Sequence, residues 1–514
     1  MDTRKRLLAM RRSAAHEAAV SAAADPAALA NPACAAGAGD RCEHPLTDAL
    51  INAELFRYEQ RVRQRFGQIV GVLQQISARQ HDADFAVTAQ GLAQERLGFE
   101  LPEDLLERAW VGGLDLRRLH SHCIMSSLKL CVDQAQAEQS GWRARLPIDE
   151  GFLRQCGYHT VDISPCADGR LQGLVPFILR MQPGPGVQVK AYAGALFDVE
   201  SDIADWAQRE VERLSGAIAG GDHLNYLKVA VYHFSSSHPA QQGCAAHGSR
   251  DRVATDAALS RLDELREAID RSFGAGAAPD ALLLGVDTDI DALRIHLPDA
   301  RGHLNPHRYV DTAVLYRQTL GLAAEAARAR IDALIADAEA MGGPGQGQGT
   351  MHDGMRRLVA ALVQANLSQI EYVVRYHGGR YSVVGHDEEC IVVGEAPNPL
   401  QLRNLFYYAH LDTIEEGAAD LDVGIRIFNG LNLVKGLAAP VLVHFNYDSR
   451  VPGSQQRSVA RARQVRDAVL RRFADLADKG QLNCDLAVSD RRGSVWCQFI
   501  ADPAGRTGTE DARS

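Results

Sequence analysis

Residues 160–170, with the sequence TVDISPCADGR, indicate the fold of this chain more directly than any other stretch. Apolar and polar side chains alternate over residues 160–164, which is the pattern of a β-strand. Three side chains suited to chemistry follow this strand at Cys166, Asp168 and Arg170. The stretch therefore predicts a strand that ends in a functional loop.

Two other apolar stretches predict buried strands. They are residues 227–232 (LKVAVY) and residues 281–286 (ALLLGV), and a helical pattern over residues 256–271 lies between them. Strands that alternate with helices indicate an α/β layer with a largely parallel sheet. Such sheets place their sites in the loops that follow the strands, which is where Cys166 and His233 stand.

Residues 44–145 have the periodicity of helices. From Ile51 to Ile76, apolar side chains recur three or four residues apart, which predicts one long helix with a single apolar stripe. Further helical pattern runs to about Ala144. By itself this pattern favours a packing or dimerisation domain without chemistry.

The last third of the chain echoes the middle. Residues 190–198 (KAYAGALFD) resemble 406–412 (FYYAHLD), and residues 229–234 (VAVYHF) resemble 441–446 (VLVHFN), at offsets of about 211 to 216 residues. A duplicated α/β unit is therefore indicated. The second copy has Pro452-Gly453 where the first has Gly243-Cys244. We expect it to fold like the first copy, to bind no metal and to pack against it.

Cys166, His233 and Cys244 supply two thiolates and one imidazole. That donor set suits zinc and leaves a fourth position for water, whose pKa the metal lowers toward neutrality so that it attacks small electrophiles. Spacing alone leaves the assignment open, because two Cys and one His so far apart are more often unrelated. His238 and His247 are rival imidazoles near Cys244.

Asp168 has two candidate roles at such a centre. It accepts a hydrogen bond from the zinc-bound hydroxide, or it binds the zinc itself and closes the site. Arg170 can hold the Asp168 carboxylate through a bidentate pair, and loss of that pair would favour the closed form.

Composition narrows the class of protein. The formal net charge of -10 argues against general nucleic-acid binding, and no apolar run reaches the ~20 residues that cross a bilayer. The 10 cysteines have irregular spacing without a Cys-x-x-Cys pair, which disfavours a disulfide framework. Residues 1–43 are rich in Ala, Gly and Pro and predict a disordered tail with a basic motif at Arg4–Arg6, Arg11 and Arg12.

Longer motifs around these residues resemble one family. They are residues 161–170 (VDISPCADGR), 231–235 (VYHFS), 243–248 (GCAAHG), 285–289 (GVDTD), 377–381 (HGGRY) and 408–413 (YAHLDT). They are similar to the carboxysomal carbonic anhydrases of the epsilon class, a divergent branch of the β-class, from about Pro45 to near residue 500. The β-class pattern Cys-x-Asp-x-Arg is intact here. The His-x-x-Cys element of that pattern is different here, because ten residues instead of two separate His233 from Cys244.

The resemblance implies the roles of the site residues. Cys166, His233 and Cys244 bind Zn²⁺, Asp168 and Arg170 form the catalytic dyad, and His386 faces the site. It also implies an α/β fold in which an N-terminal helical domain precedes two β-carbonic-anhydrase-like α/β domains, the second a degenerate copy. The expected division is a tail over 1–43, a helical domain over 44–145, a catalytic zinc domain over 146–386 and a copy without zinc over 387–514.

The implied function is zinc-dependent, reversible hydration of carbon dioxide to bicarbonate, supplying carbon dioxide to Rubisco inside the carboxysome. A homodimer or larger assembly is expected, with the tail tethered to Rubisco or to shell proteins. A sugar bisphosphate that gates activity is a further hypothesis. The alternative is a non-catalytic adaptor of Rubisco or the shell with a structural zinc, and another zinc hydrolase is weaker because no separate general base is evident.

Overall fold

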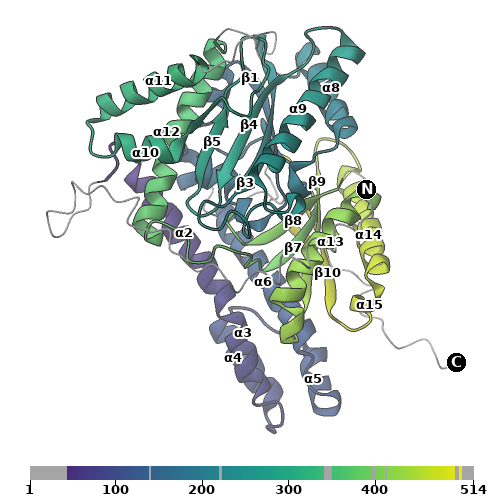
Figure 1. Cartoon of the computed structure of the whole chain (residues 1–514). Helices are drawn as coiled ribbons and strands as arrows, with labels where there is room; N and C mark the ends of the chain where they lie inside the picture. The colour runs from purple at the N-terminus through teal and green to yellow at the C-terminus, as the bar shows by residue number, and fades with distance from the viewer. Residues whose placement is uncertain are drawn as a thin grey trace.

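The computed structural model describes residues 43–137, 141–218, 223–340, 350–395, 401–411, 414–492 and 497–500. The predicted tail with its basic motif lies outside the described residues, except for residue 43. Two sheets lie side by side, and a group of helices projects beyond them (Figure 1). The predicted mixed α/β fold with an N-terminal helical region is confirmed.

The first sheet has the strand order β2-β1-β3-β4-β5-β6. Its strands are β1 (Tyr158–Pro165), β2 (Val187–Val189), β3 (Asn225–Phe234), β4 (Asp280–Asp287), β5 (Ala292–His296) and β6 (Tyr309–Asp311). The first four strands are parallel to one another, whereas β5 pairs antiparallel with both β4 and β6. The three predicted strands are therefore confirmed as β1, β3 and β4 of a largely parallel sheet.

Helices join and flank these strands. They are α7 (Glu150–Gln155), α8 (Val199–Leu214), α9 (Asp251–Phe273), α10 (Thr312–Thr319), α11 (Ala324–Ala340) and α12 (Asp353–His377). Helix α9 packs against β3 and α8 packs against α9, while α10 and α12 pack against β5 (Figure 1). Both faces of β1 are thereby buried.

Apolar and polar side chains alternate along β1, although both faces of the strand are buried. The polar side chains therefore need partners inside the protein. Asp162 Oδ2 accepts from Lys228 Nζ at 2.9 Å, and the same ammonium donates to Ser164 Oγ at 2.8 Å. Lys190 Nζ donates to Asp202 Oδ1 on α8 at 2.8 Å. The polar side chains of β1 are thus compensated inside the protein, as buried charges require.

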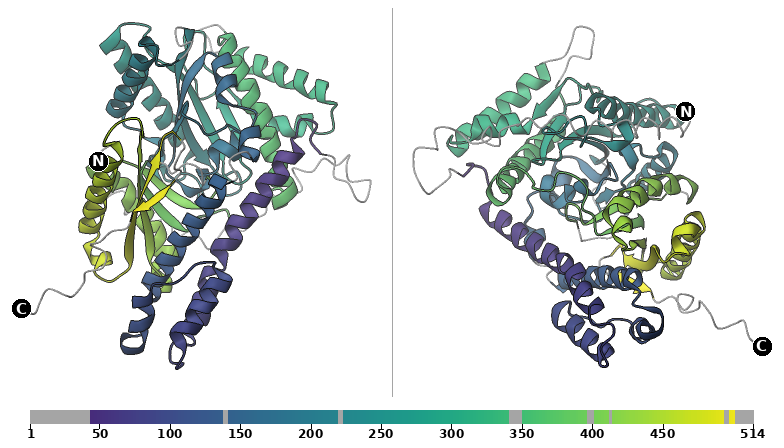
Figure 2. Two further views of the ribbon diagram at one scale, coloured as in Figure 1. Left: turned by 180° about the vertical axis from the view of Figure 1, so that it is seen from behind. Right: turned by 60° about the horizontal axis from the view of Figure 1, so that its bottom comes forward.

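The N-terminal region forms a helical arm. Its helices are α2 (Ala49–Gly67), α3 (Ile69–Ser77), α4 (Phe85–Arg96), α5 (Glu103–Gly112) and α6 (Leu116–Ala137). Helices α3, α4 and α5 project below the sheets in Figure 1, α2 and α6 connect them to the sheets, and Figure 2 shows the arm from behind. The prediction of one long helix from Ile51 to Ile76 is wrong. The helix is interrupted at Gln68, next to Gly67, whose missing side chain lowers helix propensity.

The second sheet has the order β11-β10-β9-β7-β8. Its elements are β7 (Cys390–Gly394), β8 (Phe406–His410), α13 (Ile414–Leu431), β9 (Ala439–Tyr447), α14 (Ser454–Arg472), α15 (Ala474–Ala477), β10 (Leu482–Asp490) and β11 (Gln498–Ile500). In reverse, this order matches β2-β1-β3-β4-β5 strand for strand, and the last strand is antiparallel in both sheets. The shared topology supports the predicted duplication.

The sequence match of residues 229–234 with 441–446, combined with the strand register of each sheet, identifies the counterparts of the site residues. Ile163 lies opposite Val229 in the first sheet, and Ile391 lies opposite Val441 in the second. Counting onward, Gly394 occupies the position of Cys166, and Phe445 that of His233. Cys166 bridges Tyr192, and Gly394 pairs with His410. In the structure, Tyr192 therefore corresponds to His410 of β8. The sequence match paired Tyr192 with Tyr408, two residues earlier.

The edge strand of the second sheet docks directly on the predicted functional loop. Backbone amides of Asn404, Tyr408 and His410 donate to the carbonyls of Gly169, Ala167 and Ala191 at 2.8, 3.4 and 3.0 Å. The second sheet and the helical arm also share one hydrophobic core, separate from that of the first sheet. No helix among the described residues is long and apolar enough to span a membrane.

Glu59 fastens the helical arm to α12. Its carboxylate accepts from Arg63 Nε at 2.6 Å, lies 3.2 Å from His377 Nε2 and accepts from the Tyr372 hydroxyl. Burial raises the pKa of Glu59, but the hydrogen bond from His377 and the charge of Arg63 outweigh burial and lower it from 4.5 to about 2. Because the folded pKa lies below the unfolded one, the stability is fully present above about pH 4.5 and is lost as pH falls toward 2.

We expect Glu59→Gln to lower the free energy of unfolding by up to about 3 kcal/mol at pH 7, and by progressively less below pH 4.5. Urea denaturation at several pH values measures the difference from wild type. Glu95→Gln, at an exposed pair with Arg96 on α4, is the control and should cost under about 1 kcal/mol. A Glu59→Gln deficit that did not change with pH would contradict the assignment.

Candidate metal centre and active site

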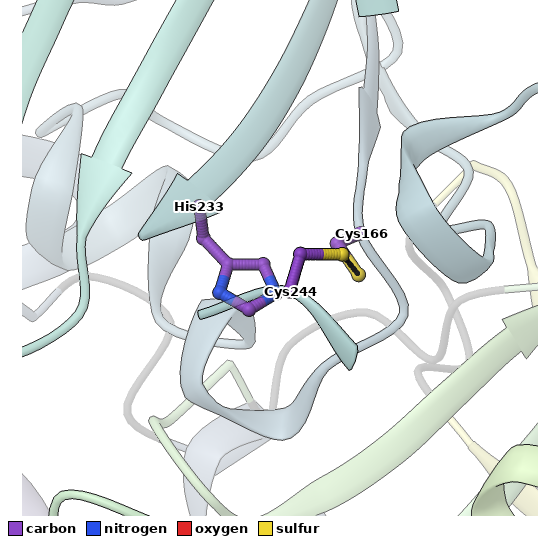
Figure 3. A group of neighbouring side chains, drawn as sticks. All are labelled: Cys166, His233 and Cys244. Atoms are coloured by element: carbon purple, nitrogen blue, oxygen red, sulfur yellow. Dashed lines mark hydrogen bonds between the residues drawn. The ribbon is translucent and has the colours of Figure 1, made fainter. Parts of the chain in front are cut away.

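The ends of two parallel strands bring the predicted ligands together. Cys166 directly follows β1, His233 is the penultimate residue of β3, and Cys244 precedes a short 3₁₀ turn at Ala245–His247. Their ligand atoms all lie within 4.8 Å of one another, and all three residues are buried (Figure 3). The two Sγ atoms are 3.8 Å apart. The long segment between His233 and Cys244 thus returns to the same edge of the sheet.

The imidazole of His233 has no hydrogen-bond partner at either ring nitrogen among the described residues, although its exposed fraction is 1%. Buried polar groups are rarely left in this way. Asp168 Oδ2 lies 3.5 Å from His233 Nε2. An unpartnered imidazole beside two thiols fits a divalent metal that takes nitrogen and sulfur ligands, and zinc has that preference.

The two thiols affect each other's ionisation. The contact with Cys244, together with burial, raises the pKa of Cys166 well above its ordinary value, and the same contact lowers the pKa of Cys244. Gly194 N–H lies 3.3 Å from Cys166 Sγ and is the backbone donor to it. A cation held between the sulfurs would reverse the shift at Cys166, because coordination deprotonates thiols.

Arg170 holds Asp168 by both carboxylate oxygens. Arg170 Nε donates to Oδ1 at 2.8 Å and Nη2 donates to Oδ2 at 2.7 Å, while the Arg170 backbone N–H also donates to Oδ1 at 3.0 Å. Burial raises the pKa of Asp168, but the charge of Arg170 outweighs burial and lowers it well below the usual range. Arg170 Nη1 is held in turn by the Gln242 and Val384 carbonyls at 2.7 and 3.3 Å. The predicted pair is therefore a fixed bidentate fork.

His386 approaches Asp168 from the loop before β7. It forms a second group with Asp168 and Glu388, again with ligand atoms within 4.8 Å. His386 Nδ1 lies 2.8 Å from Glu388 Oε1, and its side chain is 28% exposed. Burial lowers the pKa of His386, but the charges of Asp168 and Glu388 outweigh burial and raise it. The His386 imidazole therefore lies between the Asp168–Arg170 pair and the protein surface.

Sequence reasoning missed Glu388. Its carboxylate is buried, and Oε2 has no hydrogen-bond partner among the described residues. A Cβ atom at Gly169 would overlap the Glu388 side chain, so any larger residue between Asp168 and Arg170 would force Glu388 to move. The acidic run that follows His386 in the sequence was the available signal.

The rival imidazoles stand apart from the cluster. His247 Nε2 lies 3.0 Å from the Gly194 carbonyl oxygen, and His238 Nδ1 lies 2.8 Å from Ser237 Oγ at the surface. Neither belongs to a group of potential metal ligands among the described residues. In the second sheet, glycine and phenylalanine occupy the positions of Cys166 and His233 and offer no ligand atoms.

Comparisons with known proteins identify the family. Three families described as carboxysome shell carbonic anhydrase match the chain: the N-terminal domain over residues 44–136, the catalytic domain over 148–386 and the C-terminal domain over 387–504. The chain is 44% identical to the carboxysome shell carbonic anhydrase of Halothiobacillus neapolitanus, covering 91% of this chain and 92% of the relative.

Two further relatives carry the same name. The protein of Parasynechococcus marenigrum is 42% identical over 89% of this chain and 79% of its own length. That of Prochlorococcus marinus is 42% identical over 87% of each chain. These matches favour an enzyme over a non-catalytic adaptor. The chain belongs to the carboxysome shell carbonic anhydrase family, and it is a carboxysomal carbonic anhydrase.

Proposed function

We propose that this protein hydrates carbon dioxide reversibly to bicarbonate at a zinc ion held by Cys166, His233 and Cys244. The observation that carries the proposal is the buried His233 imidazole, unpartnered among the described residues, beside two thiols 3.8 Å apart. When bound, zinc would supply a Lewis acid that lowers the pKa of a coordinated water molecule. These three residues would hold the metal and would leave a fourth position for water or substrate, as in catalytic zinc sites.

Asp168 and Arg170 orient the reaction. Asp168 Oδ2 faces His233 and would accept a hydrogen bond from the oxygen that adds to carbon dioxide. Arg170 donates to both oxygens of that carboxylate, which keeps Asp168 anionic and fixes its orientation. An anionic carboxylate can only accept hydrogen bonds, so Asp168 would bind an attacking oxygen that carries a proton. That hydrogen bond would orient the oxygen's lone pair toward carbon dioxide.

The experiment that tests this function combines carbon dioxide hydration with metal removal. Purified protein under reducing conditions should contain one zinc per chain and hydrate carbon dioxide. A chelator should abolish the activity, and Zn²⁺ should restore it. Stoichiometric zinc without hydration would instead support a structural zinc in an adaptor.

We expect His386 to carry the proton released by the reaction. His386→Ala should lower kcat about 10²-fold in weak buffer, because a positioned acid–base group contributes on that order, and concentrated imidazole buffer should restore it. Stopped-flow hydration at several buffer concentrations measures this. His238→Ala removes an imidazole that contacts Ser237 at the surface and should leave kcat unchanged. A His386→Ala enzyme with wild-type kcat in weak buffer would contradict the role.

The cellular setting follows from the family. Inside the carboxysome the enzyme would run mainly in the dehydration direction and supply carbon dioxide to Rubisco. The tail of residues 1–43 would tether it to Rubisco or to shell proteins, and the chain would assemble as a homodimer or larger. The second α/β unit would bind no metal and take the place of a paired domain.

A sugar bisphosphate that signals the Rubisco compartment would gate the activity. Such a ligand needs clustered cations. Arg294, Arg317 and Arg380 contribute to the lining of a cavity of about 300 Å³ in the first α/β unit, which is a candidate location. Activity that did not change with saturating sugar bisphosphate would dismiss this part of the proposal.

A further inference from the structure

The backbone turn that donates to Cys166 has an unfavourable conformation. It spans Tyr192–Ala195, and both Gly194 and Ala195 have positive φ, 74° and 58°. Such conformations cost about 1–3 kcal/mol at a residue other than glycine and persist only where surrounding structure holds them. His247 supports one side of the turn through the Gly194 carbonyl oxygen. The Gly194 N–H, which points to Cys166 Sγ, therefore depends on contacts from outside the turn.

A carboxylate of the second α/β unit supplies the contact next to that amide. Ala193 N–H donates to Asp420 Oδ2 at 2.9 Å, although 227 residues separate the two in the chain. A backbone amide bound to a carboxylate makes a charge-assisted hydrogen bond, which is stronger than a neutral one. The Ala193 and Gly194 amides are consecutive, so fixing one restricts the other.

Asp420 is itself held in place from its own unit. The Tyr407 hydroxyl on β8 donates to the Asp420 carbonyl oxygen at 2.8 Å, and Tyr407 is buried. A Cβ atom at Gly424 would come within 2.8 Å of the Tyr407 ring, so glycine lets α13 approach β8 closely. The close approach brings the Asp420 carboxylate to the Tyr192–Ala195 turn.

We propose that Asp420 is a positioning residue for the metal centre, acting through the Ala193 and Gly194 amides on the Cys166 sulfur. The second unit, which offers no metal ligands at the equivalent positions, thereby takes part in the site of the first. The N–H donor stabilises the negative charge of the thiolate and limits how strongly its sulfur donates to a metal. Changes to such supporting contacts cost about 10–100-fold in metal affinity or activity. This inference rests on the proposed metal centre at Cys166.

Two variants of nearly equal shape isolate the acceptor. Asp420→Asn keeps a carbonyl oxygen that can accept from Ala193 N–H, whereas Asp420→Leu keeps the volume and has no acceptor. Ala193→Pro removes the donor from the other end without changing any residue of the second unit, although the proline ring also displaces the Asp420 carboxylate from the amide. Tyr192 is extended, with φ −133° and ψ 146°, which is the conformation that a residue before proline requires. The control is Asp485→Leu, since burial also raises the pKa of Asp485 to about 6, as it does for Asp420.

Two readouts on the purified full chain report on the sulfur. The first is the dissociation constant for Zn²⁺, from competition with a chelator. The second is the thiolate-to-metal charge-transfer absorption of protein loaded with Co²⁺, which a role in stability alone would not shift. We expect Asp420→Leu and Ala193→Pro each to weaken Zn²⁺ binding about tenfold or more and to shift the absorption, while Asp420→Asn and Asp485→Leu remain near wild type.

The double variant Asp420→Leu/Ala193→Pro should weaken Zn²⁺ binding no more than either single change, because both remove the same hydrogen bond. Wild-type Zn²⁺ affinity and absorption in Asp420→Leu, or in Ala193→Pro should the Leu variant not fold, would overturn the inference. Wild-type protein that bound no Zn²⁺ at Cys166 would instead overturn the proposed function.

Discussion

Cys166→Ala is expected to abolish both metal binding and carbon dioxide hydration. The change leaves one thiol and one imidazole, too few ligands for a site that already offers only three. Since changes merely beside metal ligands cost 10–100-fold, removal of a ligand should weaken Zn²⁺ binding by more than about 10²-fold. Metal analysis after dialysis, together with stopped-flow hydration, measures both effects.

The matched control for Cys166→Ala is Cys123→Ala. Cys123 is a buried thiol of α6 in the helical arm, so its replacement tests the general cost of losing a buried sulfur. It should cost some stability and leave zinc content and activity at the wild-type level. Activity retained by Cys166→Ala would remove that cysteine from the metal site.

Arg170→Ala is expected to inactivate the enzyme without releasing its zinc. Removing one partner of a buried ion pair leaves an uncompensated charge, which costs about 3–5 kcal/mol. The Asp168 carboxylate, whose Oδ2 lies 3.5 Å from His233 Nε2, would relieve that cost by turning toward the metal and would close the open position. We expect kcat/KM to fall at least 10²-fold with one zinc per chain retained.

Arg170→Lys separates charge from geometry. Lysine keeps the positive charge but lacks the planar fork that binds both carboxylate oxygens, so its activity should lie between wild type and Arg170→Ala. X-ray absorption at the zinc edge should report an added oxygen ligand in Arg170→Ala. Arg308→Lys is the control for replacing a buried guanidinium, because Arg308 is buried in the loop before β6. It should leave the activity close to that of wild type. Full activity in Arg170→Ala would contradict the role assigned to the pair.

The sequence was sufficient to predict what lies along single strands. The alternation over residues 160–164 and the apolar runs before His233 and up to Val286 gave three correct strands, because strand patterning is local. The three ligands were proposed from their donor types and from the family resemblance, and two of them, Cys166 and His233, were expected at strand ends of one parallel sheet. Their convergence depended on β1 and β3 being neighbours in the sheet, which the alternation of strands and helices already favours.

Contacts between the two units could not be read from local pattern. Glu388 and Asp420 are acidic residues in unremarkable surroundings, and their importance comes from Gly169 and from Ala193, over 200 residues away in the chain. The break at Gln68 was also missed, since apolar periodicity continues through it. Likewise, nothing in the helical periodicity indicates that the arm shares its core with the second sheet.

The central claim is that Cys166, His233 and Cys244 hold one zinc and leave a position open for the reaction. Anomalous scattering at the zinc edge from crystals of the active protein tests it most directly. We expect one peak within bonding distance of both sulfurs and a ring nitrogen of His233, with Asp168 still paired to Arg170. A peak elsewhere, or one with a fourth ligand from the protein in the active enzyme, would contradict it.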